Sequence, residues 1–458
     1  MIDPGVVEIL KGIVGPENVL TEQESLVCYS FDATRYTSLP HAVVKPRSSE
    51  EVAGVVTLAY EETIPVTPRG AGTGLSGGSV PIQGGIVVSM ERMNSPAVIH
   101  KEDLYAIVEA GVVTEHFRRD VEAKRLFYPP DPASQAACTI GGNIGECAGG
   151  LRGLKYGTTK NYVLGLEIVT PEGKLLRTGA RTVKSVAGYD VTRLMVGSEG
   201  TLGIVTSAVL RLLPLPRARR MIAGRFEDIT SAAEAVAEIT ANGLVPSILE
   251  IMDHKTVEAV GAFLKESLGD GVLLLAEFDG AKSLCEEEAS RAIEILNARQ
   301  GGAIEDDVKG KKSAKLWEAR RAALPALTRL CTSVILEDVT VPRSMLPDMV
   351  NKIARIADKY DVGVAVFGHA GDGNIHPTFL TDRRDPGELK RVEAAIAEMM
   401  GASIDLGGTI SGEHGIGVDK MPFLKLEVGE AGYEIMKRLK GSLDPGSIMN
   451  PGKMFYDN

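Results

Sequence analysis

The first 215 residues alternate short apolar runs with loops. Two stretches, Pro4–Gly15 and Ser49–Glu61, have the apolar spacing of amphipathic helices, and Ser48 with Glu51 fits a capping box at the start of the second. Apolar runs bounded by turn residues predict strands. The predicted strands are Ala42–Lys45, Ile64–Thr67, Gly85–Met90, Leu104–Glu109, Val163–Thr170, Leu175–Thr178 and Gly203–Leu213, with a further helix near Thr114–Ala123. This region is therefore expected to be an α+β unit.

A proline-rich joint, Leu213-Pro-Leu-Pro-Arg217, precedes a change to strands and helices in regular succession. Two series of runs follow, which favours two related β-α-β units sharing one sheet. The first series is Arg220–Phe226, Ser231–Asn242, Ser247–Met252, Lys255–Ser267, Val272–Phe278 and Ala281–Arg299; the second is Val334–Val341, Met345–Tyr360, Val362–Phe367, Ile375–Leu380 and Pro386–Met400. The expected domains are residues 1–35, an N-terminal helical segment, then 36–215, 216–420 and a C-terminal segment, 421–458.

The amino-acid composition argues against several classes of function. The charges sum to −11 over 458 residues, and no clustered basic face is evident, so nucleic acid is not an expected partner. The five cysteines include no C-x-x-C pair, so the chain cannot build its own iron–sulfur cluster, and any electrons it handles must leave by another carrier. Neither a leader pattern nor an apolar run of membrane-spanning length is present. We expect a cytoplasmic protein without a transmembrane segment, which would reach a membrane only through a partner.

Glycine accounts for 51 residues, about 11% against a typical ~7%, and it gathers in loops such as Arg69–Gly85 and Gly141–Gly157. The segment Gly72-Thr-Gly-Leu-Ser-Gly77 matches G-x-G-x-x-G, which suggests a dinucleotide-binding turn. A Rossmann turn opens a helix, however, whereas here the chain continues into the predicted strand at Gly85–Met90. The alternative is a nest of backbone N–H groups, Arg69 to Gly78, that wraps a diphosphate without a helix.

Two motifs carry a resemblance to a known family. Pro68-Arg-Gly-Ala-Gly-Thr-Gly-Leu-Ser-Gly-Gly78 resembles the pyrophosphate loop of the vanillyl-alcohol-oxidase (PCMH-type) FAD-binding flavoproteins, and Gly188–Ile204 resembles their second signature. The likeness extends from about Ser30 to Lys453. It is closest to the D-2-hydroxyacid dehydrogenases of that family, the glycolate oxidase and D-lactate dehydrogenase type.

The resemblance implies a fold and a cofactor. The fold would be α+β, with a PCMH-type FAD-binding domain of two α+β subdomains at 36–215, a substrate or cap domain with a largely antiparallel sheet flanked by helices at 216–420, and a terminal segment that returns to the FAD domain. The resemblance also implies the residues that would contact FAD: Pro68, Arg69, Gly70, Gly72, Thr73, Gly74, Gly77, Gly78, Pro130, Gly141, Gly142, Asn143, Gly145, Gly153, Tyr156, Gly157, Gly200, Ile204 and Asn450.

Three of the seven histidines fall between residues 369 and 414. On one straight strand, His369 and His376 would face opposite sides, because seven is odd. The Gly371-Asp-Gly-Asn374 turn between them folds the chain into a hairpin, so both imidazoles can flank its mouth. With Glu413 they form a set of two imidazoles and a carboxylate that suits Zn²⁺, Mn²⁺ or Fe²⁺. The alternative is that they are turn histidines bonded to backbone.

In the family that this motif resembles, the histidine pair and the glutamate bind a divalent metal, and the histidine after the glutamate is the base that removes the hydroxyl proton. The resemblance thus assigns His369, His376 and Glu413 to the metal and His414 to the base. A neutral histidine near pH 7 is suited to accept a proton.

Arg320 follows the only tryptophan by three residues. Its guanidinium can bind a carboxylate through two hydrogen bonds, and the resemblance places a substrate-binding arginine here, with Asn374 as a second substrate contact. Arg321 points about 100° away on a helix and is expected to face solvent. The nearby apolar residues Leu324, Ile335 and Leu336 favour a monocarboxylate substrate.

The predicted activity is FAD-dependent oxidation of a small D-2-hydroxy acid, lactate or glycolate, to the 2-oxo acid. A hydride would pass to flavin N5, and an electron-transfer flavoprotein, a quinone or an iron–sulfur partner subunit would accept the electrons. The alternatives are a 2-hydroxyglutarate dehydrogenase and a non-redox FAD enzyme of the alkylglycerone-phosphate synthase kind. A third class is a protein without flavin, either a metal-dependent hydrolase or a binding protein whose glycine loops hold a nucleotide.

Overall fold

In the computed structural model, the described residues are 2–307 and 311–456, and side chains are described outside 302–307 and 311–314. The chain divides into two compact units. Unit 1 contains Met1–Gly149, Thr158–Leu215 and Glu413–Asn458, and unit 2 contains Gly150–Gly157 and Pro216–Gly412. The change of unit after Leu215 falls within the proline-rich joint. Among the described helices, none combines the length and the apolar character that crossing a membrane needs.

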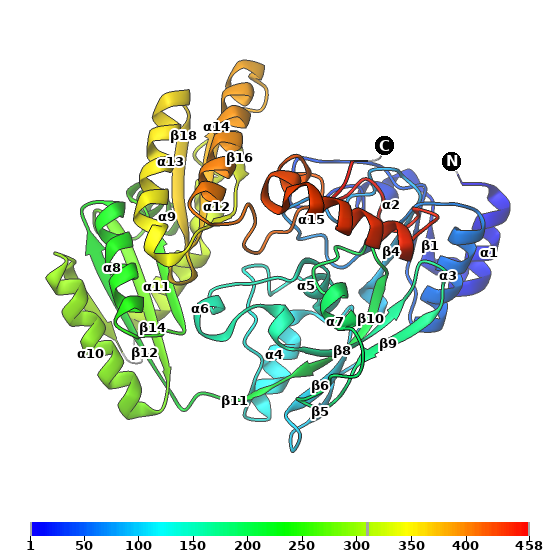
Figure 1. Cartoon of the computed structure of the whole chain (residues 1–458), viewed down its shortest axis with the longest axis horizontal. Helices are drawn as coiled ribbons and strands as arrows, with labels where there is room; N and C mark the ends of the chain where they lie inside the picture. The colour runs from blue at the N-terminus through cyan, green and yellow to red at the C-terminus, as the bar shows by residue number, and fades with distance from the viewer. Residues whose placement is uncertain (1, 308–310, 457–458) are drawn as a thin grey trace. The chain divides into compact units, whose positions relative to one another are not determined.

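Unit 1 contains two main sheets with helices, drawn mostly in blue to green in Figure 1. The first sheet has the order β1 (Val19–Leu20), β2 (Ala42–Val44), β4 (Ile86–Ser89), β3 (Val66–Arg69), and the second has the order β5 (Val98–His100), β6 (Tyr105–Glu109), β10 (Ile204–Arg211), β8 (Val163–Val169), β9 (Leu175–Gly179). A short pair joins β7 (Leu126–Phe127) to β11 (Leu213–Pro214). The helices are α1 (Pro4–Val14), α2 (Gln23–Val27), α3 (Ser49–Glu61), α4 (Thr114–Ala123), α5 (Ile140–Glu146), α7 (Val191–Met195) and α15 (Met421–Leu443).

Local sequence explains how these elements begin. In α1, Asp3 caps the first turn and Gly15 ends the helix at positive φ, as the proline–glycine pattern predicts. The capping box at α3 is only half formed, which corrects the sequence interpretation. Ser48 Oγ accepts from the Glu51 N–H, but the Glu51 carboxylate accepts from the backbone N–H of Arg47 and not from that of Ser48. An ion pair with the Arg47 side chain holds the carboxylate there.

The connection between β3 and β4 settles the question of the glycine loop. The two strands are parallel neighbours, and the residues between them, 70–85, contain no helix. A Rossmann turn would have placed a helix directly after the glycines. The G-x-G-x-x-G match is therefore a long loop that crosses between two strands of one sheet.

Unit 2 is built on one eight-stranded sheet in which every described strand pair is antiparallel. The strands are β12 (Ala218–Phe226), β13 (Ile248–Met252), β14 (Val272–Gly280), β15 (Gly302–Asp307), β16 (Ser333–Leu336), β17 (Val339–Thr340), β18 (Gly363–His369) and β19 (Asn374–Thr381). The helices are α6 (Gly153–Tyr156), α8 (Ile229–Ala241), α9 (His254–Leu264), α10 (Lys282–Ala298), α11 (Lys311–Arg321), α12 (Ala323–Leu327), α13 (Leu346–Tyr360) and α14 (Pro386–Asp405).

The helices of unit 2 form two groups. Helices α8, α10, α13 and α14 pack against one another, and α9, α11 and α12 form a second group whose apolar residues join β12, β14 and β18 in one core cluster. The shared sheet confirms the sequence prediction. In the first series, β12 and β13 flank α8 and both pair with β14. In the second series, β17 and β18 flank α13 and both pair with β19. Each series therefore has the split β-α-β arrangement.

Candidate active site

The loop from Gly70 to Ser79 in unit 1 leaves its amide groups available. Within the described chain, none of its backbone N–H groups donates a hydrogen bond to a protein acceptor. Backbone N–H groups in folded proteins are nearly always paired, so an unpaired run of this length marks a place for an acceptor from outside the chain. Successive amides of this kind form an anion-binding nest, which suits the oxygens of a diphosphate.

Several carbonyl groups of the same loop are bonded to the protein, and this restrains the loop's conformation. Gly74 O accepts from the Ala33 N–H, and Ser76 O accepts from the Val418 N–H at 2.8 Å. Gly78 O accepts from Asn450 Nδ2 at 2.7 Å. The loop is therefore held by its oxygens while its nitrogens stay free, an arrangement that favours an anionic ligand.

Other predicted cofactor residues of unit 1 border this loop. A methyl group added at Gly70 would overlap Thr139 Oγ1 and lie 3.7 Å from the Gly142 Cα atom, at the start of α5. A methyl group added at Gly200 would likewise overlap the Pro68 side chain. The Asn143 side chain is used inside the protein, because Nδ2 donates to Thr114 Oγ1. Other predicted cofactor residues also lie in unit 1, and their role stays a prediction: Thr73, Gly77, Pro130, Gly141, Gly145 and Ile204.

A cavity of about 610 Å³ opens beside the start of the loop. Its lining includes Arg69, Gly70, Val112, His116 and Thr139, all in unit 1. This volume lies within the range of small-molecule sites and admits part of a dinucleotide. Arg69 does not reach into solvent; its guanidinium is buried and donates to Ser79 Oγ at 3.3 Å.

Three carboxyl groups, those of Asp32, Glu146 and Glu199, gather behind the loop. A methyl group added at Gly74 would lie 3.8 Å from Asp32 Oδ2 and 3.7 Å from Glu146 Oε1. Glu199 accepts from the Ile416 N–H at 2.7 Å and from the Gly417 N–H at 2.6 Å. The oxygens Asp32 Oδ2 and Glu146 Oε2 are buried without a hydrogen-bond partner among the described residues.

Burial raises the pKa of Glu146 well above its ordinary value, and the nearby negative charges of Glu199 and Asp32 add to the shift. Burial also raises the pKa of Glu199 and lowers that of Lys453 to about 8. Glu146 therefore keeps its proton to a higher pH than an exposed glutamate would. A neutral Glu146 removes one negative charge from the vicinity of the anion-binding loop.

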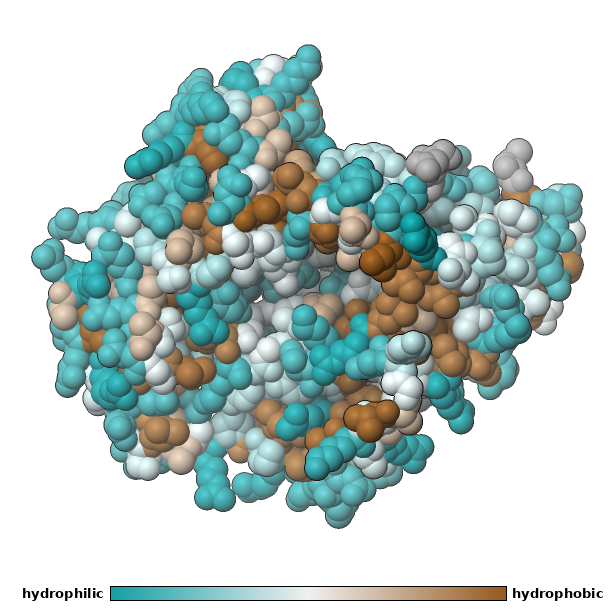
Figure 2. Space-filling view, in the orientation of Figure 1, coloured by the Kyte–Doolittle hydropathy of each residue, from teal (hydrophilic) through white to brown (hydrophobic). Residues whose placement is uncertain are grey.

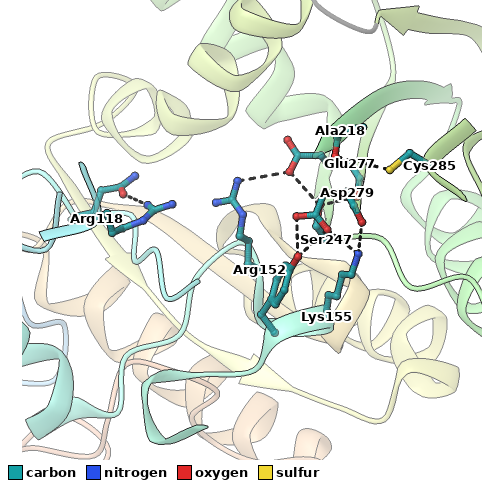
Figure 3. Close-up of polar contacts among 10 residues, drawn as sticks. Arg118, Arg152, Lys155, Ala218, Ser247, Glu277, Asp279 and Cys285 are labelled. Carbon is teal, nitrogen blue, oxygen red and sulfur yellow. Dashed lines mark hydrogen bonds and ion pairs between the residues drawn. The ribbon is translucent and has the colours of Figure 1, made fainter. Parts of the chain in front are cut away.

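Three of the predicted flavin contacts, Gly153, Tyr156 and Gly157, belong to unit 2. Figure 3 shows how their segment is held against β14: Lys155 Nζ lies 2.6 Å from Asp279 Oδ1, and Arg152 points toward Glu277 at 3.5 Å. The Tyr156 hydroxyl donates to the same Asp279 carboxylate. Asp279 thus fixes both Lys155 and Tyr156, a role that the sequence reasoning missed.

Within unit 2, the structure confirms the predicted hairpin of β18 and β19. The rings of His369 and His376 lie edge to face with centroids 5.1 Å apart, and both side chains are buried. The turn therefore brings the two imidazoles together as expected.

Glu250 in β13 organises this region. Its carboxylate lies 2.7 Å from His369 Nδ1 and also accepts a hydrogen bond from Arg320 Nε. With its proton on Nδ1, His369 presents the lone pair of Nε2, the arrangement usual for a metal-ligating histidine. Arg320 uses Nε to bind Glu250, so its two terminal nitrogens remain for another acceptor. Its guanidinium also lies 4.9 Å from the Phe367 ring centroid. Arg320 is buried, so it is not a surface arginine, and Arg321 is exposed, as expected.

The Asn374 amide nitrogen is committed to the protein. It donates to Asp338 and, at 2.9 Å, to Thr340 Oγ1. Asp338 also accepts from Ser411 Oγ at 3.0 Å and lies 3.7 Å from His376 Nδ1. Any contact of Asn374 with a substrate would therefore use its carbonyl oxygen.

Glu413 and His414 are the first residues of the last segment of unit 1. Glu413 packs against Gly149, where an added methyl group would lie 2.6 Å from its carboxylate. The next residues are fixed through the two hydrogen bonds from Ile416 and Gly417 to Glu199. The structure thus places the predicted histidine pair in one unit and the predicted Glu413–His414 pair in the other.

Besides Asp279, two residues that organise these groups were missed by the sequence reasoning, and only Glu250 left a clear signal. Glu250 is the one charged residue in the strand Ile248–Met252, all of which is buried, and a lone charge in an apolar strand indicates a bonded partner. Glu146 lies within the second glycine stretch, Gly141–Gly157, but nothing in the sequence indicates that it would meet Glu199.

These features agree with comparisons to known proteins. A family model described as FAD linked oxidases, C-terminal domain, matches residues 215–454, and an FAD binding domain matches residues 40–179. The chain belongs to the FAD-linked oxidases and is an FAD-binding oxidoreductase.

The chain is 45% identical to glycolate oxidase subunit GlcD of Bacillus subtilis (strain 168), over 99% of this chain and 97% of that protein. It is 36% identical to D-lactate dehydrogenase of Anaerostipes hadrus, over 99% of this chain and 98% of that protein. In fold it resembles p-cresol methylhydroxylase, with a TM-score of 0.81 at 19% identity, over 99% of this chain and 97% of that chain. The fold is the predicted PCMH-type FAD-binding fold.

The buried acids behind the loop predict a change in how stability depends on pH. The pKa of Glu146 is raised in the folded state, so folding loses stability as the pH rises from the ordinary glutamate value through the folded-state value. Glu146→Gln keeps the neutral form at every pH. Its melting temperature relative to the parent protein should therefore increase between about pH 5 and about pH 9.

Differential scanning calorimetry of both proteins across this range makes the comparison. Glu122→Gln, at an exposed position on α4, serves as the control and should follow the parent protein. A melting-temperature difference between Glu146→Gln and the parent that stays constant with pH would contradict the assignment.

Proposed function

We propose that this chain oxidises a small D-2-hydroxy acid, lactate or glycolate, to the 2-oxo acid. The proposal rests on one observation: the Glu250 carboxylate binds both His369 and Arg320 and so positions these two side chains next to each other. An imidazole with a lone pair and a guanidinium with free terminal nitrogens match the two oxygen-bearing groups of a 2-hydroxy acid. Relatives named glycolate oxidase subunit GlcD and D-lactate dehydrogenase support the substrate class.

Arg320 would bind the substrate carboxylate. Its Nε is held by Glu250 and its plane by Phe367, so little side-chain freedom is lost when its terminal nitrogens bind a ligand. Of the apolar residues expected near it, Leu324 and Leu336 pack against the same core cluster as Ala319, and Leu324, Ile335 and Leu336 are all partly buried. This environment favours lactate or glycolate over 2-hydroxyglutarate, which carries a second carboxylate.

The donor set fits a divalent metal, Zn²⁺, Mn²⁺ or Fe²⁺. His369 has the carboxylate partner that metal-bound histidines usually have, and His376 lies beside it on the next strand. Glu413 would be the third ligand. It follows Gly412, which packs against Asn374 in the same hairpin, so the chain itself brings Glu413 to within one residue of that turn. A bound metal would supply positive charge that favours loss of the hydroxyl proton.

His414 would accept the proton of the substrate hydroxyl. It is buried, and the hydrogen bonds from the following residues to Glu199 restrict its backbone. When bound, FAD accepts a hydride at N5. The unpaired amides from Gly70 to Ser79 would hold its diphosphate, and the residues implied by the family resemblance would line the rest of the cofactor.

The electrons would pass to an external acceptor, such as an electron-transfer flavoprotein, a quinone or an iron–sulfur partner subunit. The five cysteines of this chain contain no cluster-binding pattern, so the chain requires an external acceptor. The Bacillus subtilis and Escherichia coli relatives are named as subunits, which supports a partner protein. We place the reaction in the cytoplasm, with any membrane contact made through the partner.

Anaerobic mixing of the FAD-loaded protein with D-lactate or glycolate tests the proposal directly. The flavin absorption band should bleach with a saturable rate, because the substrate reduces the flavin and no acceptor is present. L-lactate, the mirror image, is the matched control and should reduce the flavin slowly. Bleaching by D-2-hydroxyglutarate alone would assign the alternative substrate, and no bleaching by any hydroxy acid would favour a non-redox enzyme of the alkylglycerone-phosphate synthase kind.

Arg320→Lys should raise KM for the hydroxy acid by roughly 10–100-fold with kcat less affected, because an ammonium cannot form both hydrogen bonds to a carboxylate. Steady-state kinetics with an artificial acceptor measures both constants. Arg321→Lys, at the exposed neighbour, should behave like the parent protein. Equal KM values for the two variants would show that the carboxylate binds elsewhere.

His376→Ala and His414→Ala separate the roles of ligand and base. His376→Ala should lose metal, and activity with it, because one of three protein ligands is removed. His414→Ala should keep metal and FAD but slow flavin reduction by about 10²–10⁴-fold. Metal analysis and anaerobic rapid mixing of both variants give the comparison. If His414→Ala loses metal and His376→Ala retains it, the two roles are reversed.

A further inference from the structure

A buried carboxylate lies beside His376, and the proposed reaction gives it no role. Charged side chains usually stay at the surface, and Figure 2 shows hydrophilic residues over much of the face that it draws. The carboxylate of Asp338 is an exception, because none of it is exposed to solvent. It lies 3.7 Å from Nδ1 of His376. Burying a carboxylate is costly unless it is paired or hydrogen-bonded, so the position of Asp338 depends on the groups around it.

The register of the sheet explains why Asp338 lies there. In unit 2, the hairpin of β18 and β19 has β13 on one side and β17 on the other. On the β13 side, the pairing brings Glu250 next to His369. On the β17 side, the residue that precedes the strand, Asp338, comes next to His376. Each histidine of the hairpin therefore has one carboxylate near its Nδ1 atom, supplied from outside the hairpin.

Two hydrogen bonds orient the Asp338 carboxylate. Asn374 Nδ2 donates to Oδ1, which is also the oxygen nearest to Nδ1 of His376. Ser411 Oγ donates to Oδ2 at 3.0 Å. All of these residues belong to unit 2. Neither donor carries a charge, so these hydrogen bonds fix the carboxylate without neutralising it.

We propose that Asp338 is the positioning residue of His376 and holds the proton of this imidazole on Nδ1. A negative carboxylate near Nδ1 favours the tautomer with a proton there, which puts the lone pair on the opposite ring nitrogen, Nε2. Metal-binding histidines usually have this arrangement, with a carboxylate beside the other ring nitrogen. Glu250 and Asp338 together would give both histidines of the hairpin the same tautomer. The inference rests on the proposed metal site and makes its metal affinity depend on Asp338.

Zinc binding to the FAD-loaded full chain, freed of metal by dialysis against a chelator, tests this role. Asp338→Asn keeps the size of the side chain and can still bond Asn374 through Oδ1 and Ser411 through Nδ2, but the charge beside His376 is lost. Competition with a chromophoric chelator should show a zinc affinity about 10–100-fold below that of the parent protein. Ser411→Ala is the matched control. It removes a hydrogen bond to Asp338 but keeps the charge, and it should bind zinc nearly as tightly as the parent protein.

A double-substitution cycle shows whether Asp338 acts through His376. In a His376→Ala background, Asp338→Asn should cause no further loss of zinc affinity, because the imidazole that Asp338 positions is absent. The tautomer gives a second readout. In ¹⁵N NMR spectra of the metal-free protein labelled at histidine, the signals of His376 are those that His376→Ala removes. They should show the proton on Nδ1 in the parent protein and a shift of the proton toward Nε2 in Asp338→Asn.

The outcomes separate this role from the metal site on which it depends. A parent protein that binds no zinc would exclude the proposed metal site and the role of Asp338 with it. If the parent protein binds zinc and Asp338→Asn binds it equally well, only the role of Asp338 is overturned. A further loss of affinity in the His376→Ala background, or a proton on Nε2 of His376 in the parent protein, would also overturn it. The measurement on the parent protein decides the matter even if Asp338→Asn does not fold, which its FAD content and circular dichroism reveal.

Discussion

One buried carboxylate, that of Glu250, determines how unit 2 presents its polar groups. A carboxylate without solvent on an apolar strand is costly unless it is paired and hydrogen-bonded. Glu250 meets that condition with two partners at once, Arg320 and His369. Since one carboxylate restrains both side chains, the spacing between a cation and an imidazole is fixed by the sheet and not by flexible side chains. Removing Glu250 would therefore disturb two side chains, those of Arg320 and His369, that lie 49 residues apart in the sequence.

Much of the fold was accessible from the sequence because local patterns and tertiary structure agree. The proline–glycine boundaries of α1 and the odd spacing of His369 and His376 around a glycine turn predicted what the structure contains. The strand that follows the glycine loop distinguished it from a Rossmann turn, which a helix would follow. The parallel pairing of β3 and β4 explains why no helix is needed there.

Long-range polar pairs could not be predicted from the sequence, since no local sequence pattern indicates them. Glu250 with Arg320, Asp279 with Lys155, and Glu199 with Gly417 join residues that are 70 or more positions apart. Asn374 illustrates the difference. It was expected to contact the substrate, yet its amide nitrogen is already used to hold Asp338. Sequence motifs thus indicated candidate site residues, but only the fold shows which of their atoms are already used within the protein.

The order of segments has a consequence for how the protein is made. The chain passes from one unit to the other after residues 149, 157, 215 and 412, so neither unit is a continuous stretch of polypeptide. Asn450, which holds the carbonyl of Gly78, is made 372 residues after it. The glycine loop therefore cannot reach its final conformation until residue 450 has been synthesised and has folded back onto unit 1. Cofactor loading would wait for that step, and no single proteolytic cut or truncation could yield either unit intact.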